Sequence, residues 1–167
     1  IKQETDKLDN AALTELKKRV DIVPPSLALA QAAEESGWGT SRFAIKGNSL
    51  FGQWDFSGKG IKPEEQRTEL GNYGIAAFDS PQDSIEAYML NLNTHRAYQR
   101  MRQKRAVFRQ QNKRPTGWEL AKTLDKYSER GIEYVKSLHA IMSYNKLNDA
   151  DQAFLWDKGK IVVSLAP

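Results

Sequence analysis

The chain has 167 residues, of which 40% are hydrophobic and 28% charged, and its net charge is +4. This length suits one domain of ordinary size, and the composition is that of a folded globular protein and excludes extensive disorder. There is no cysteine, which excludes disulfides, thiolate metal sites and cysteine nucleophiles. No apolar run approaches the ~20 residues of a membrane-spanning helix. The opening residues contain no signal peptide, and because Ile1 is not a methionine we expect a processed or trimmed chain.

Helical patterns dominate the first part of the sequence. The stretch from Asn10 to Val20 places apolar residues among lysines and predicts a first helix or arm. A second helix is predicted to begin at Pro24-Pro25 and to end at Gly37, because proline suits the first turn of a helix and glycine its end. Its leucines and alanines leave little polar face, so we expect it to be buried nearly all round.

The segment from Gly47 to Gly74 changes character. It contains six glycines with aromatic residues between them. Glycine-rich punctuation of this kind is typical of loops and a short β-hairpin, which we place near residues 55–78.

Helical patterns return after this segment. Ser80 is a suitable N-cap for a helix that begins at Pro81, and a basic helix or pair of short helices follows, to Arg114. Thr116 and Glu119 form a predicted capping box, and "GIEYVKSLHAIMSYNKL" predicts one more amphipathic helix. The tail contains "FLW" and "IVVSL" and is apolar enough to dock, which favours a strand there. The elements together predict a mainly helical α+β domain with a small hairpin.

Two adjacent acids end the second predicted helix, in "AQAAEESGWG". In a helix Glu34 and Glu35 point about 100° apart, so at most one of them shares the buried side. Burial and the negative end of the helix dipole both raise the pKa of such a carboxyl, as a general acid requires. The alternative is that both acids lie in water at the helix end, and spacing alone does not choose between these two interpretations.

Aromatic residues are dense just after these acids, from Trp38 to Phe78, and amide side chains lie among them. Rings and amides together suit a carbohydrate, because a sugar packs its C–H face on a ring and its hydroxyls bind amides. The alternative is a hydrophobic core beneath long loops. This zone also contains the candidate second carboxylates, which are Asp55, Glu64, Glu65, Glu69 and Asp79.

The segment from Arg96 to Arg114 holds eight Lys and Arg residues and no acid. We interpret it as a solvated basic face, with an anionic partner as the alternative, since no nucleic-acid-binding motif accompanies it. His139 lies on an apolar stripe and is expected to be a structural core residue. Neither a metal-ligand spacing nor a nucleotide-binding or serine-nucleophile motif is present, which leaves carboxylate chemistry or none.

Three blocks of the sequence resemble one known family in the same order and spacing, over roughly Val23 to Tyr144. They are "AQAAEESGWGTS" with "NSLFG" after six further residues, "FDSPQDSIEAYMLNLNTHRAY", and "LDKYSERGIEYVKSLHAIM". The family is glycoside hydrolase family 73, the glucosaminidases that include the flagellar muramidase domain, and the resemblance is to its Bax-like branch. Two details differ from the family, which often has Asn-Asn where this chain has Asn48-Ser49 and "YATD" where it has "YSER".

The resemblance implies a lysozyme-like α+β fold, mainly α, with a small β-hairpin lobe beside a substrate cleft. The implied domain spans 23–147, with an N-terminal arm or helix at 1–22 and a tail at 148–167 packed on the domain. By position Glu35 matches the family's general acid, Tyr127 its active-site tyrosine and Glu69 its second carboxylate, with Glu64 and Glu65 nearby, whereas Glu34 is expected to be decorative. The expected substrate-binding residues are Trp38, Asn48, Phe51, Gln53, Trp54, Tyr73, Phe78 and Tyr98.

The resemblance implies a peptidoglycan hydrolase, an endo-β-N-acetylglucosaminidase that cleaves β-1,4 bonds without a cofactor or metal. The expected partner is the glycan strand of peptidoglycan, with no nucleic acid and no membrane segment in this chain. We also expect a monomer that works outside the cytoplasm, in the periplasm or cell envelope. The alternatives are a lytic transglycosylase and a non-catalytic glycan- or polyanion-binding module.

Overall fold

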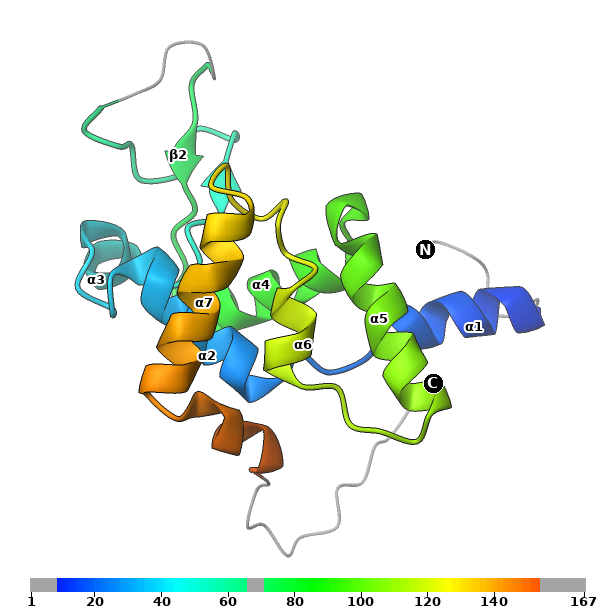
Figure 1. Cartoon of the computed structure of the whole chain (residues 1–167). Coiled ribbons are helices and arrows are strands. Elements are labelled where there is room, and N and C mark those ends of the chain that lie inside the picture. The colour runs from blue at the N-terminus through cyan, green and yellow to red at the C-terminus, as the bar shows by residue number, and fades with distance from the viewer. Residues whose placement is uncertain (1–8, 66–70, 154–167) are drawn as a thin grey trace, which may run out of the picture.

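The computed structural model describes residues 9–65 and 71–153 and has the expected mainly helical architecture with one small sheet (Figure 1). No helix within these ranges is both long enough and apolar enough to cross a membrane. In chain order the elements are α1 Asn10–Arg19, α2 Pro25–Ser36, α3 Arg42–Gly47, β1 Trp54–Asp55, β2 Gly74–Ile75, α4 Pro81–Thr94, the 3-10 helix η3 Arg96–Tyr98, α5 Gln99–Gln110, α6 Gly117–Ala121, α7 Ile132–Tyr144 and the 3-10 helix η4 Leu147–Gln152.

Short polar side chains begin several of the helices, as the sequence predicts. Ser80 Oγ accepts a hydrogen bond from Asp83 N at 3.2 Å at the start of α4. Thr116 Oγ1 accepts from Glu119 N at 3.4 Å at the start of α6. Only this half of the predicted capping box forms, because the Glu119 carboxylate pairs with Lys104 and Lys122 instead.

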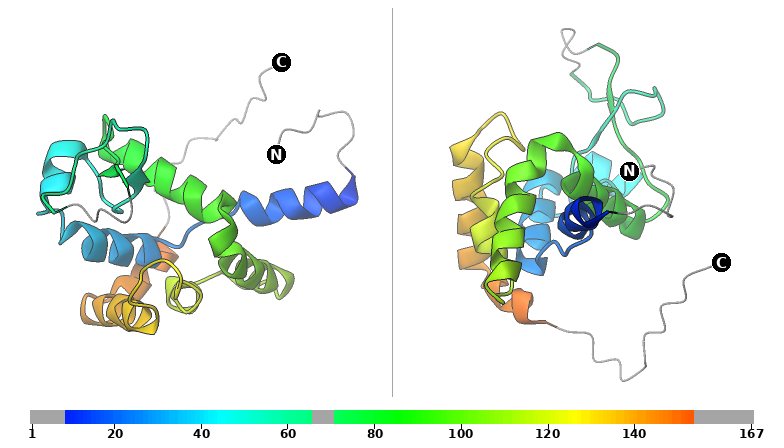
Figure 2. Two further views of the ribbon diagram at one scale, coloured as in Figure 1. Left: turned by 90° about the horizontal axis from the view of Figure 1, so that it is seen from above. Right: turned by 90° about the vertical axis from the view of Figure 1, so that its right-hand side faces the viewer.

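Helix α2 runs through the middle of the helical part, with α6 and α7 on one side and α4 on the other (Figure 2). Its buried residues join side chains of α4, α6 and α7 in one core. The prediction that α2 is buried nearly all round is wrong at Leu29, which is 50% exposed. The largest buried core side chains are Leu27, Tyr88, Leu92, Met101, Leu120, Leu124, Tyr134, Leu138 and Met142.

Asp151 of η4 fastens the N-termini of two helices. Its side chain is 2% exposed and accepts hydrogen bonds from Ser26 N at 2.9 Å, Ser26 Oγ at 2.8 Å and Gly117 N at 2.9 Å. The residue before α2 is Pro24, which offers no side-chain cap, so Asp151 supplies the missing acceptor from the other end of the chain. Gly117 permits this approach, because a Cβ there would lie 2.0 Å from Ser26 Oγ.

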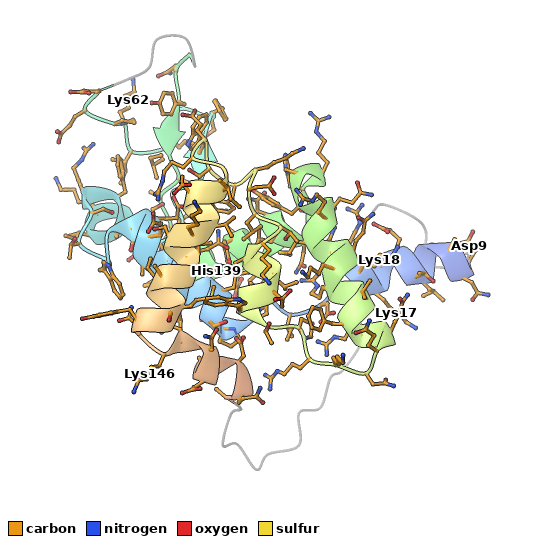
Figure 3. The ribbon with its side chains drawn as sticks, viewed as in Figure 1. Asp9, Lys17, Lys18, Lys62, His139 and Lys146 are labelled. Carbon is orange, nitrogen blue, oxygen red and sulfur yellow. The ribbon has the colours of Figure 1, made fainter. Side chains whose placement is uncertain are left out.

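The beginning of the predicted tail therefore docks on the domain as the 3-10 helix η4. The strand is predicted from "FLW" and "IVVSL" farther along the tail and stays a prediction. The rest of the tail, from 154 to 167, lies outside the described residues. His139 is a structural residue, as predicted. It lies on α7 and packs against α6 (Figure 3). Its ring stacks on that of Trp118 with 3.9 Å between centroids, and its Nε2 lies 2.9 Å from Trp118 O.

The prediction of a fully solvated basic face on α5 is wrong for two arginines. Arg105 is fully buried and donates to Ile22 O at 2.8 Å, Lys18 O at 2.6 Å and Asn93 Oδ1 at 2.7 Å. Arg102, 3% exposed, donates to Leu92 O and His95 O. These guanidinium groups satisfy carbonyl oxygens at the ends of α1 and α4, so they hold helices together instead of facing a polyanion.

The hairpin lobe contains a two-stranded antiparallel sheet in which Trp54 is paired with Ile75 and Asp55 with Gly74. The Asp55 carboxylate accepts bonds from the turn that follows it, including Gly60 N at 2.6 Å and Ser57 N at 3.0 Å. These bonds, that from Ser57 above all, lower the pKa of Asp55. Asp55 is thus a turn-forming residue and a poor candidate for the second carboxylate.

Candidate active site

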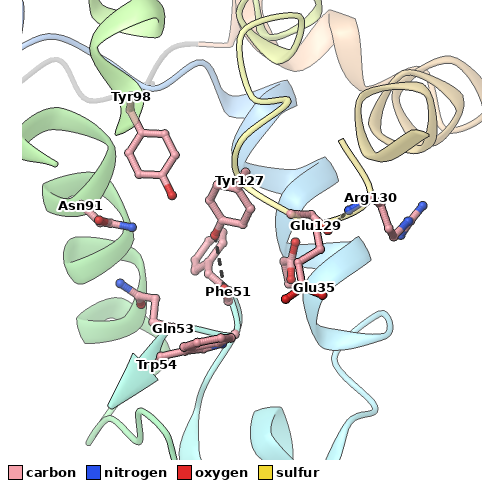
Figure 4. Close-up of a pocket in the computed structure, with 11 residues that line it drawn as sticks. Glu35, Phe51, Gln53, Trp54, Asn91, Tyr98, Tyr127, Glu129 and Arg130 are labelled. Atoms are coloured by element: carbon pink, nitrogen blue, oxygen red, sulfur yellow. Dashed lines mark hydrogen bonds between the residues drawn. The ribbon is translucent and has the colours of Figure 1, made fainter. Parts of the chain in front are cut away.

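Glu35 lies in the last turn of α2 and lines a pocket of about 480 Å³ (Figure 4). The helix ends directly after it, because Gly37 adopts the left-handed conformation with φ of 57°. The pocket is walled by the segment before β1, by α4, by η3 and by the loop between α6 and α7. Its lining residues are Glu35, Phe51, Gly52, Gln53, Trp54, Asn91, Tyr98, Tyr127, Ser128, Glu129 and Arg130.

The backbone at Gly52 passes close to the Glu35 carboxyl. Gly52 has φ of +59°, which a side chain would strain, and a Cβ there would lie 3.4 Å from Glu35 Oε2. This close approach shields one side of the Glu35 carboxyl from water.

The environment of Glu35 favours its protonated form. Burial raises the pKa of the Glu35 carboxyl, and the charge of Glu34 raises it further, while a hydrogen bond from Tyr134 and the charge of Arg130 lower it by less. The position at the C-terminal end of α2 acts in the same direction as burial. A carboxyl whose pKa is raised and that still lines an open pocket is suited to general acid catalysis.

A buried chain of hydrogen bonds connects Glu35 with the core. Tyr88 Oη donates to Gln31 Oε1 at 2.7 Å, and Gln31 Nε2 donates to Tyr134 Oη at 2.8 Å. The Tyr134 hydroxyl, which accepts from Gln31, is thereby oriented to interact with the Glu35 carboxyl and lowers the pKa of that carboxyl. Gln31 and Tyr88 are fully buried and Tyr134 is 1% exposed, so the chain orients Glu35 from inside the core.

We expect the variant Tyr134→Phe to shift the alkaline limb of the pH–rate profile to higher pH. The lost hydrogen bond stabilises the ionised form of Glu35, so its removal raises the pKa of that carboxyl, and a general acid stays active up to its pKa. The measurement is kcat/KM as a function of pH. Tyr144→Phe on the same helix is the matched control, since Tyr144 is 89% exposed. An unmoved limb, or one at lower pH, contradicts this role of Tyr134.

Glu34 is not decorative, which corrects the prediction. Its side chain is 17% exposed and forms an ion pair with Arg130, and its second oxygen accepts from Ser137 Oγ at 2.8 Å. It thereby joins α2 to α7 and holds the loop that carries Arg130 against the pocket.

Tyr127 stands in the wall of the same pocket. Its hydroxyl donates to Phe51 O at 3.2 Å, and its ring lies parallel to that of Tyr134, with 5.5 Å between centroids. The ring of Tyr98 is also in contact, with 5.8 Å between its centroid and that of Tyr127. The aromatic wall beside Glu35 is therefore held by both stacking and a backbone hydrogen bond.

Comparison with known proteins decides the family. The family model described as Glucosaminidase, mannosyl-glycoprotein endo-beta-N-acetylglucosaminidase, matches residues 10–147. The chain belongs to the glucosaminidase family. It is 37% identical over 131 residues, 78% of its length, to a protein named "Protein bax" from Escherichia coli strain K12. The chain spans 46% of the length of that relative. No solved structure matches it significantly.

The description of the family as an endo-beta-N-acetylglucosaminidase supports glycosidase chemistry for this domain. The described residues contain no group of three His, Asp or Glu side chains that could hold a metal ion.

The structure brings together six of the residues predicted from the sequence. Glu35, Phe51, Gln53, Trp54, Tyr98 and Tyr127 all line the pocket. Glu69 lies outside the described residues, so its role stays a prediction.

The remaining four predicted sugar contacts do not line this pocket. Trp38 is 62% exposed, and Asn48 ends α3 and donates to Phe78 O at 3.0 Å. Tyr73 is buried and stacks on Trp54 at 5.2 Å, so it supports the ring that does line the pocket. A substrate contact of these four residues stays a prediction.

The sequence interpretation missed Asn91, Glu129 and Arg130 in the pocket and Gln31 behind it. Asn91 lies three residues after Tyr88 on α4, and this helical spacing indicates that the two side chains share one face of the helix. Glu129 and Arg130 belong to "YSERG", noted above as the block that differs from the family. Gln31 lies four residues before Glu35 and therefore on the same face of α2.

Proposed function

We propose that this chain is a peptidoglycan hydrolase, an endo-β-N-acetylglucosaminidase with Glu35 as its general acid. The observation that carries the proposal is a carboxyl of raised pKa, held by a buried tyrosine and open to a pocket lined by rings and amides. Family membership supports the same class of reaction.

In this proposal the sugar chain lies across the pocket, with one ring packed against Trp54 and its hydroxyls bound by amides such as Gln53 and Asn91. Glu35 donates its proton to the bridging oxygen while the C1–O bond breaks, so the leaving sugar departs as a neutral alcohol. Positive charge develops on the remaining sugar, and the Glu35 carboxylate that has lost its proton stabilises this charge. Tyr127 orients the acetamido group or the developing cation.

The second carboxylate has two candidates. Glu69 is proposed on the resemblance alone, because it lies outside the described residues. Glu129 is proposed on its position, since it lines the same pocket as Glu35. Either would activate a water or act as nucleophile, and an acetamido oxygen acting as internal nucleophile would need neither.

The proposed reaction adds water across a β-1,4 bond after N-acetylglucosamine, and it requires no cofactor. The proposed location is the periplasm or cell envelope, because the substrate lies there, and the proposed state is a monomer.

The products formed from purified peptidoglycan test this proposal. We expect new reducing ends that carry N-acetylglucosamine, detected by mass spectrometry after borohydride reduction, because hydrolysis leaves a hemiacetal. A 1,6-anhydromuramic end would instead assign the chain to the lytic transglycosylases. Binding of the glycan without any cleavage, over the pH range in which Glu35 changes protonation, would assign it to the non-catalytic modules.

A further inference from the structure

A second pocket adjoins the one that contains Glu35. The two pockets share Gln53, Trp54, Asn91 and Tyr98, which lie on the side away from Glu35 (Figure 4). The second pocket has a volume of about 710 Å³. Because they share this wall, the two pockets form one groove that leads from the acid along α4.

The two parts of the groove differ in charge. Glu35, Glu129 and Arg130 line the first part, which therefore has ionisable groups of both signs, whereas Lys126 and His95 line the second, with no carboxylate among the described residues there. The carboxylate next to Lys126 in the chain, that of Asp125, is engaged by Arg100 at 2.7 Å. No acid in the described ranges pairs with Lys126. The second part of the groove therefore attracts anions.

His95 also has a fixed orientation. Its Nδ1 accepts a hydrogen bond from Ala97 N at 3.3 Å, so in the neutral ring the proton is on Nε2. Nε2–H is then a donor for an acceptor in the groove. Lys126 and His95 thus supply a positive charge and a hydrogen-bond donor.

The remaining wall of the second pocket is mostly apolar. It consists of Ala87, Leu90, Ala97 and Thr94, whose hydroxyl donates to Leu90 O at 2.7 Å. Leu90 is 62% exposed although it lies in a groove. An exposed leucine beside small side chains offers surface for methyl-sized groups of a ligand. Its ligand therefore combines small apolar groups with a carboxylate.

Resting on the proposed function, we propose that this second pocket is a subsite for the peptide substituent of the glycan, with Lys126 and His95 binding one of its carboxylates. Alternate sugars of peptidoglycan carry a lactyl ether that is extended by a short peptide with alanine methyl groups and free carboxylates. A strand cut at Glu35 places such a sugar next to the cleaved bond. The apolar wall then receives the methyl groups and the cationic side the carboxylate.

The test compares two forms of the same glycan strands, one with its peptides and one from which an amidase has removed them. We expect the wild-type protein to cleave the peptide-bearing strands with the higher kcat/KM. In Lys126→Met the ratio of the two values falls about fivefold, as expected for one partly exposed charge-assisted contact of about 1 kcal/mol. Lys126→Glu lowers the ratio further, because it repels the carboxylate.

Lys17→Met is the control for charge, since Lys17 is exposed on α1 and lines neither pocket. It leaves both rates unchanged. Equal rates of the wild type on both substrates, or an unchanged ratio in both Lys126 variants, overturn the subsite. Failure of the proposed function gives a different result, because the wild type then releases no reducing ends from either form.

Discussion

The variant Glu35→Gln loses cleavage of peptidoglycan, with kcat/KM lower by about 10²–10⁴-fold, because glutamine keeps the shape of the side chain but has no acidic proton for the leaving oxygen. Reducing ends released from purified peptidoglycan measure this loss. Glu133→Gln is the matched control: Glu133 is an exposed acid on α7 outside the pocket, and we expect it to leave kcat/KM unchanged.

The same variant is expected to be at least as stable as the wild type near neutral pH. Burial raises the pKa of Glu35 in the folded chain, so the stability that goes with its protonated form is lost as the pH rises through the folded pKa. Glutamine does not ionise and avoids this loss. Urea unfolding at acidic and at neutral pH measures the difference. Normal activity of Glu35→Gln would remove Glu35 from the chemistry, whereas inactivity with a lower unfolding midpoint would attribute the loss to misfolding.

The variant Asp151→Ala is expected to lower the free energy of unfolding by about 3–5 kcal/mol, a large part of the ~5–15 kcal/mol of a typical domain. It removes a buried acceptor and leaves three donors without their partner, at Ser26 N, Ser26 Oγ and Gly117 N. It also removes the negative charge from the N-terminus of α2. Denaturant unfolding followed by circular dichroism measures the loss.

Asp149→Ala is the matched control for this prediction. Asp149 lies on the same 3-10 helix but is exposed, so its removal is expected to change the unfolding free energy by less than about 0.5 kcal/mol. Equal midpoints for Asp151→Ala and Asp149→Ala would mean that η4 does not hold the two helices together.

The residues changed in these predictions could be found from the sequence to different degrees. Glu35 was one of two equivalent acids on spacing alone, and the resemblance selected it. Its buried partner Tyr134 lies in a stretch that predicts only an amphipathic helix, since nothing local distinguishes a core tyrosine from one that donates to an acid. The sequence gives no signal for the buried role of Asp151, because this residue lies in a polar stretch that predicts a loop.

The helix starts at Ser80 and Thr116 and the helix end at Gly37 were determined by the sequence itself, because a cap acts on backbone groups only a few residues away. The helical class and the hairpin position followed from local periodicity in the same way. The tertiary structure alone decided that Arg105 is buried, that Gln31 holds Tyr134 and that Glu129 enters the pocket. The bond between Gln31 and Tyr134 spans 103 residues and that between Ser26 and Asp151 spans 125. Contacts over such separations depend on how the helices pack, and that packing is a property of the whole core.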